Sequence, residues 1–177
     1  SGEQVTGVNV NYRKGGLQLG TSCLYHAYDR MYNPKLQEYN RYYLRDSTHV
    51  NGSVDYSFQL PGFLIAGETA IARNGAVATL NTIQYRSTGG STLTLLYRHY
   101  PISYNALHGQ AFSEGSTLRN ENGLYLGGGF TPTRGVMVNS YLDLAHHPWM
   151  RLGVDEPSST IDYYLLTSWE ISRRTSL

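Results

Sequence analysis

The sequence contains very little cysteine and few charged residues. Of its 177 residues only Cys23 is a cysteine, which excludes an internal disulfide framework and any metal site built from several cysteines. Charged residues make up 15% of the chain, compared with roughly 25% of an average soluble domain. The formal net charge is +1, so charge gives no support for nucleic acid as a partner.

Long hydrophobic runs and helical patterns are scarce as well. The most apolar segment is GFLIAGETAIA, residues 62–72, and Glu68 interrupts it. No stretch reaches the ~20 apolar residues that a membrane-spanning helix needs. The only candidate helix, at 33–46, would be a short helix inside a loop. The chain is therefore expected to be all-β.

Strict alternation of apolar and polar residues is frequent in the sequence. In HVNGSVDYSFQL, residues 49–60, apolar or small residues alternate with polar ones, so a strand here would have one apolar and one polar face. The same period predicts nine strands, at 5–13, 17–28, 49–60, 63–73, 76–87, 91–100, 122–131, 136–146 and 160–172. In the fifth of these the apolar face is ambiguous. The strands run about 10–12 residues, longer than the usual ~5–6 and long enough to cross a bilayer at a tilt.

The connections between these strands differ in length in a regular way. Tight turns with Gly or Pro, at 14–16, 61–62, 88–90 and 132–135, follow the odd-numbered strands. Long polar connections, at 29–48, 101–121 and 147–159, follow the even-numbered ones, apart from the short Asn74-Gly75. In an antiparallel up-and-down meander the two kinds lie at opposite ends of the sheet, as in outer-membrane barrels. The whole chain, 1–177, is thus predicted to be a single β-barrel domain.

The two faces of the barrel are expected to have different surroundings. Six side chains of the apolar face are predicted to face lipid: Val54, Phe58, Leu142, Leu144, Leu165 and Trp169. Six charged side chains of the other face are predicted to face the lumen, because charge is costly against lipid: Asp55, Glu68, Arg98, Asp143, Asp162 and Glu170. There they would form a wall network or, as the alternative, set ion selectivity. The alternative is a soluble β-sandwich or lipocalin-like ligand-binding domain in which the apolar face is the interior.

The predicted strand count is odd, whereas antiparallel closure of a single-chain barrel needs an even count. Nine long strands would also leave two unpaired edges, and the terminal ISRRTSL lacks the aromatic residue expected at the end of a complete outer-membrane barrel. The chain is therefore expected to be a fragment of a larger barrel. Its expected partners are the lipid bilayer and further strands, from the same barrel or from other outer-membrane subunits.

Several segments add a resemblance to these patterns. ALHGQAFSEGSTLRNENGLYLGGGFTPTRG, residues 106–135, resembles a family of outer-membrane β-barrel proteins from Bacteroidota-type bacteria, as do 67–86, 95–115 and the loop at 148–151. The resemblance implies a bacterial outer-membrane location and a role in passage, binding or anchoring at the cell surface. Relatives often carry helix-hairpin-helix repeats that bind DNA, and because this sequence has none, no nucleic-acid role is carried over.

The sequence gives only weak evidence for a catalytic or a metal site. His146 and His147 are neighbours, so on a strand they would point to opposite faces and chelate poorly; they are interpreted as loop histidines. His108, Ser113 and Glu114 could suggest a hydrolase, but no Gly-x-Ser-x-Gly motif accompanies them. They are interpreted as polar loop residues. The sequence therefore predicts no enzyme, no catalytic residue, no cofactor and no metal.

Overall fold

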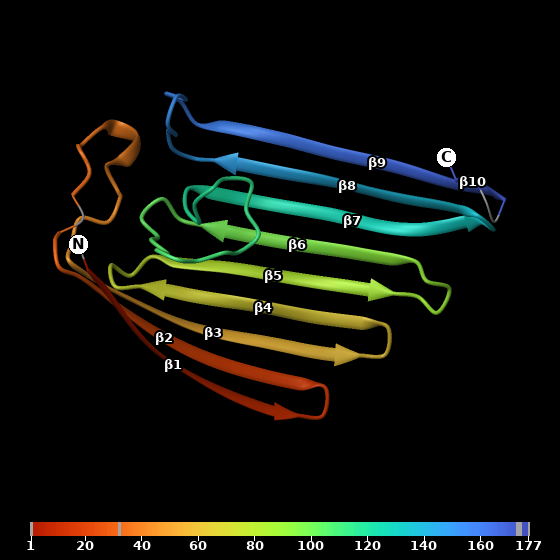
Figure 1. Ribbon diagram of the computed structural model, residues 1–177, viewed down its shortest axis with the longest axis horizontal. Helices are drawn as coiled ribbons and strands as arrows, with labels where there is room; N and C mark the ends of the chain where they lie inside the picture. Colours follow the sequence, from red (N-terminus) through yellow and green to blue (C-terminus); the bar gives the residue numbers. More distant parts are fainter. Residues whose placement is uncertain (1, 32, 173–174, 177) are drawn as a thin grey trace.

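The computed structural model describes residues 2–31, 33–172 and 175–176 and is one antiparallel sheet (Figure 1). Its strands are β1 Glu3–Lys14, β2 Leu17–Tyr28, β3 Thr48–Leu60, β4 Phe63–Ala72, β5 Val77–Arg86, β6 Thr92–Tyr100, β7 Glu121–Thr133, β8 Val136–His147, β9 Ser158–Ser172 and the short β10 Thr175–Ser176. Among the residues described, the one helical element is the 3-10 helix η1 at Glu38–Asn40, which lies within the predicted 33–46. No helix in the described residues is long and apolar enough to span a membrane.

Each strand pairs with its neighbour in the sequence, so the sheet is an up-and-down meander. This confirms the predicted all-β fold, and each predicted strand end lies within two residues of the observed one. The sheet is open: among the described residues no pairing joins β1 to β9. Figure 1 shows these two strands at opposite margins of a curved sheet.

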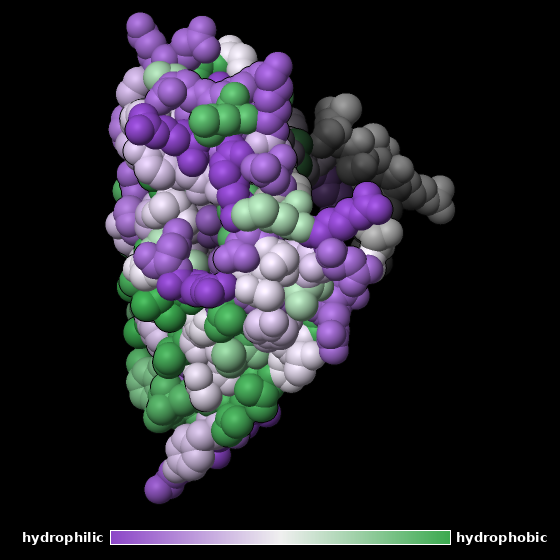
Figure 2. Space-filling view, turned by 90° about the vertical axis from the view of Figure 1, so that its left-hand side faces the viewer, coloured by the Kyte–Doolittle hydropathy of each residue, from purple (hydrophilic) through white to green (hydrophobic). Residues whose placement is uncertain are grey.

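The long loops lie at one end of the sheet and the short turns at the other, as predicted, except that the short Asn74-Gly75 turn lies at the loop end (Figure 1). At the turn end, Gly15, Gly62, Gly90 and Gly135 have φ values of 57°, 76°, 85° and 82°, a region in which a side chain is strained. The loop end carries the connections 29–47, 101–120 and 148–157. Figure 2, which views this end, shows hydrophilic side chains over its upper part and hydrophobic ones lower down.

The pairing register assigns each strand residue to one of two faces, because directly paired residues of antiparallel strands share a face. Asp55 pairs with Glu68, Glu68 with Leu80, and Leu80 with Arg98. We call the face that carries these residues the polar face. We call the opposite face, which carries Val54, the apolar face.

The apolar face is exposed along the whole sheet. All six predicted lipid-facing residues lie on it, with exposed fractions of 58% for Val54, 39% for Phe58, 39% for Leu142, 37% for Leu144, 68% for Leu165 and 53% for Trp169. The described residues therefore do not enclose these side chains in an interior. Their placement on one face agrees with the prediction, while contact with lipid stays a prediction.

The small core lies on the opposite side, under the 101–120 loop. Its buried members are Ala72, Ala76, Ala78, Tyr100 and Tyr104. The loop folds back over the polar face, where His49 Nε2 lies 2.7 Å from the carbonyl oxygen of Asn105. The packing also resolves the ambiguous fifth strand, whose Ala78 faces this core while Ile83 lies on the apolar face.

Candidate functional site

The six predicted lumen-facing charges all lie on the polar face, but the side chains of only two of them bond to each other. Asp55 pairs directly with Glu68 in the sheet, and Asp143 pairs with Asp162. Glu170 lies near the turn end and is exposed. Of the six, only Arg98 and Asp143 bond to each other. An ion network is therefore present around Arg98 and does not include the other four charges, while a lumen-facing position of all six stays a prediction.

Arg98 lies at the centre of a buried ion network. Its side chain is completely buried and donates from Nη1 and Nη2 to the two carboxylate oxygens of Asp143, at 2.8 and 3.2 Å. Its Nε–H donates to the carboxylate of Glu121, which is also fully buried. The Phe112 ring lies 5.1 Å from the guanidinium carbon. A buried charge is costly unless it is paired, and here each charge has a partner.

Glu121 connects this network to the 101–120 loop. Its Oε1 accepts the backbone N–H of Glu114 at 2.9 Å, and its Oε2 accepts that of Gly115 at 3.2 Å. Hydrogen bonds to a charged acceptor are stronger than those between neutral groups. The network therefore holds the loop against the polar face.

His147 extends the same network, which corrects its interpretation as a loop histidine. His146 and His147 are the last residues of β8 and point to opposite faces, and His147 is 2% exposed. His147 Nδ1 lies 2.8 Å from the carbonyl oxygen of Asn120 and so carries a proton. Its Nε2 lies 3.0 Å from Glu114 Oε2, and Arg151 Nη1 lies 3.3 Å from the same carboxylate oxygen.

The three residues considered for a hydrolase bond to different partners. Ser113 Oγ donates to the carbonyl oxygen of Gly115 at 2.7 Å. Glu114 bonds to His147, while His108 bonds to Glu3. These contacts give Ser113 no base that would activate it as a nucleophile.

A row of aromatic rings runs across the polar face beside the network. Ring centroids are 5.3 Å apart between Phe112 and Tyr125, 5.6 Å between Tyr125 and Tyr141, and 5.4 Å between Tyr141 and Tyr164. These rings come from the loop and from β7, β8 and β9. Three of the rings, those of Phe112, Tyr125 and Tyr141, border a cavity of about 640 Å³ that is also lined by Asp143. Rings and charges thus line one surface that could bind a polar ligand.

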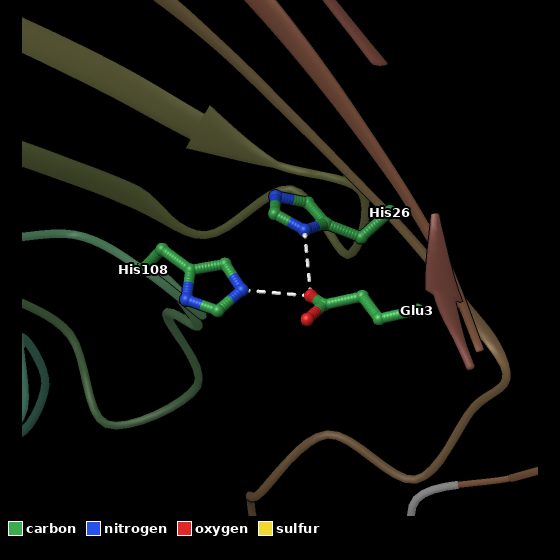
Figure 3. A group of neighbouring side chains, drawn as sticks. All are labelled: Glu3, His26 and His108. Atoms are coloured by element: carbon green, nitrogen blue, oxygen red, sulfur yellow. Dashed lines mark hydrogen bonds and ion pairs between the residues drawn. The ribbon is translucent and has the colours of Figure 1, made fainter. Parts of the chain in front are cut away.

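A second cluster joins β1, β2 and the 101–120 loop (Figure 3). His108 Nε2 lies 2.7 Å, and His26 Nδ1 lies 3.6 Å, from the same Glu3 oxygen. Sequence reasoning missed this group. The Gly15-Gly16 turn sets Glu3 opposite Tyr28 and Val5 opposite His26, so the closeness of Glu3 to His26 followed from the hairpin. The position of His108 did not.

Comparisons with known proteins add no family. No family model matches the chain, and neither the curated proteins nor the solved structures give a significant match. The resemblance to Bacteroidota-type outer-membrane barrels therefore stays a prediction.

Proposed function

We propose that this chain forms part of the wall of a β-barrel in a bacterial outer membrane, with its apolar face toward lipid and its polar face toward the lumen. The long loops and the loop-covered polar face would serve passage or binding at the cell surface. The observation that carries the proposal is the exposure of the apolar face across the nine long strands.

The size of this apolar surface supports the proposal. Full burial of a large apolar side chain is worth about 1.5–3 kcal/mol, so each of the six half-exposed residues above would gain about 1 kcal/mol from a cover. Their sum is of the same order as the ~5–15 kcal/mol net stability of a domain. Lipid supplies that cover directly, whereas a soluble sandwich would need a second layer over the face.

The edges of the sheet are evidence for further strands in the complete barrel. Every residue of β1 is exposed, and in a bilayer each backbone N–H and C=O must be paired. Strands added at β1 and β9, from the same barrel or from other subunits, would satisfy these groups. The loop asymmetry also suits an outer-membrane barrel, in which the long loops are extracellular.

The single native cysteine offers a direct test. Cys23 is exposed and lies on the apolar face, two residues from Thr21, which pairs with Val54. We would label Cys23 with a nitroxide, insert the chain into lipid vesicles, and measure relaxation by oxygen and by a water-soluble nickel chelate. Strong relaxation by oxygen with little by nickel is expected, because oxygen concentrates in acyl chains.

The matched control moves the label to the polar face. In a Cys23→Ser, Ser22→Cys variant the probe sits on the neighbouring residue, which pairs with Ser53; nickel should reach it more readily than it reaches Cys23. Weak relaxation of the Cys23 label by both reagents would indicate a dry interior and favour the soluble domain. Strong relaxation by nickel at Cys23 would place the apolar face in water and overturn the proposal.

A further inference from the structure

The Glu3, His26 and His108 cluster has the composition of a transition-metal site. Two imidazoles and one carboxylate are the ligand set that Zn²⁺ binds while keeping a further position open. One ligand atom from each residue lies within 4.8 Å of the others. Figure 3 shows both rings directed at the Glu3 carboxylate.

The distances are close to those of a coordinated ion. Ligand atoms around a tetrahedral Zn²⁺, each about 2.0–2.2 Å from the metal, lie about 3.3 Å from one another. The atom pairs His26–Glu3 and His108–Glu3 are 3.6 and 2.7 Å apart. Small side-chain movements would bring the three atoms to that spacing, because the His108 side chain is 60% exposed and free to adjust.

His26 gives the independent observation. Its ring is 2% exposed, yet its Nδ1 has no hydrogen-bond partner among the described residues and points at the cluster. A buried nitrogen that makes no hydrogen bond costs free energy, and the 3.6 Å contact with Glu3 is too long to be one. A metal ion bound through Nδ1 would satisfy this atom. The Glu3 carboxylate is also available to a metal ion, because its ion pairs are both with histidines and no guanidinium competes for it.

The comparable cluster of Glu114, Glu121 and His147 is less suited to a cation. Arg98 already pairs with Glu121, and Arg151 pairs with Glu114. These fixed positive charges compensate the carboxylates and would repel a metal ion.

We infer that Glu3, His26 and His108 form a binding site for a divalent transition metal of the Zn²⁺ type, which fastens the 101–120 loop to the β1–β2 hairpin. The inference does not depend on the membrane proposal, because it needs only the hairpin and the loop. A pocket of about 220 Å³, lined in part by His26, His108 and Tyr104, lies beside the site.

The experiment is titration of the folded chain with Zn²⁺ by calorimetry and with Co²⁺ by visible absorption. One site per chain is expected, with a Co²⁺ spectrum typical of nitrogen and oxygen ligands. His108→Asn should weaken Zn²⁺ binding at least about tenfold, since loss of a metal site's supporting groups alone costs about 10–100-fold. Zn²⁺ should also slow hydrogen exchange of residues 106–110 in the wild type.

Two control variants make the outcome decisive. His146→Asn removes a histidine from the opposite face, where it bonds Ser159, and should leave the affinity unchanged; Glu114→Gln tests the other cluster. Absence of Zn²⁺ binding, or unchanged affinity in His108→Asn, would overturn the inference. Loss of binding in Glu114→Gln alone would assign the metal to the other cluster and overturn it as well. His108 is chosen because it is exposed and its replacement should not prevent folding.

Discussion

Arg98 on β6 reaches across β7 to form a bidentate pair with Asp143 on β8, 45 positions later in the chain, with distances of 2.8 and 3.2 Å. The residue that Arg98 faces on β7 is Gly123. Because glycine has no side chain, the guanidinium passes over the strand. Three strands and the 101–120 loop are thus connected through one buried cation.

Gly123→Ala is expected to disrupt this connection. A Cβ at position 123 would overlap the guanidinium of Arg98, and overpacking of this kind costs about 1–3 kcal/mol. The free energy of unfolding should fall by that amount, and hydrogen exchange of residues 101–120 should accelerate. Gly89→Ala is the control, because a Cβ there would lie 3.7 Å from Ser87 Oγ; equal effects of the two substitutions would contradict this role of Gly123.

Asp143→Asn is expected to be more harmful than loss of an exposed carboxylate. It leaves the buried Arg98 without half of its compensation, and removal of one partner of a buried pair costs about 3–5 kcal/mol. Chemical unfolding should report that loss. Glu170→Gln, on an exposed residue of the same face, should change stability by less than about 0.5 kcal/mol. A similarly small effect at Asp143 would mean that the network is not stabilising.

Tyr104 makes the loop contact sensitive to alkali. Burial, and then the negative charge of Glu68, raise the pKa of the Tyr104 phenol. The folded protein therefore keeps this proton at a pH where the unfolded chain, with a pKa of about 10, loses it. The contribution of the protonated Tyr104 phenol to the free energy of unfolding is therefore complete below about pH 10. It disappears as the pH rises through the raised pKa of Tyr104 in the folded protein. The difference between the tyrosinate absorbance titrations of wild type and Tyr104→Phe should show a midpoint above 10, and a midpoint at or below 10 would contradict burial of this residue.

Two adjacent leucines of β9 allow a test of the faces. Leu165 lies on the apolar face and Leu166 on the polar face, with exposed fractions of 68% and 44%. If the apolar face contacts lipid, Leu165→Arg should cost about 2–4 kcal/mol in vesicles, the cost of arginine near the bilayer midplane. Leu166→Arg should cost much less. Equal tolerance of both substitutions in vesicles would argue against a lipid-facing surface.

The features of the fold that depend on residues close together in the sequence were predictable. Alternation around Val54 and Asp55 fixed the two faces, and the glycine turns fixed the hairpin registers, so the strands and their order were predictable. The fifth strand was ambiguous because Ala78 packs under a loop while Thr79, on the apolar face, is polar. That packing depends on residues far away in the sequence.

The site was predictable only in part. Arg98 and Asp143 were identified because charges on a strand stand out among apolar residues. Glu121 was missed and His147 was wrongly interpreted as a loop histidine, because each lies at a strand end and bonds to backbone atoms of the 101–120 loop. No period in the sequence reports how a twenty-residue polar loop folds back onto a sheet.

The short Asn74-Gly75 turn has a structural consequence for its surroundings. Asn74 donates to the carbonyl oxygen of Ser103 at 2.7 Å, and the neighbouring Ala76 belongs to the same buried core as Tyr104. The 101–120 loop thus lies in the space that a longer β4–β5 connection would occupy. An epitope tag inserted at Gly75 would displace that loop and uncover the polar face at the loop end of the sheet. The same tag at Gly90, at the turn end, would leave the loop in place.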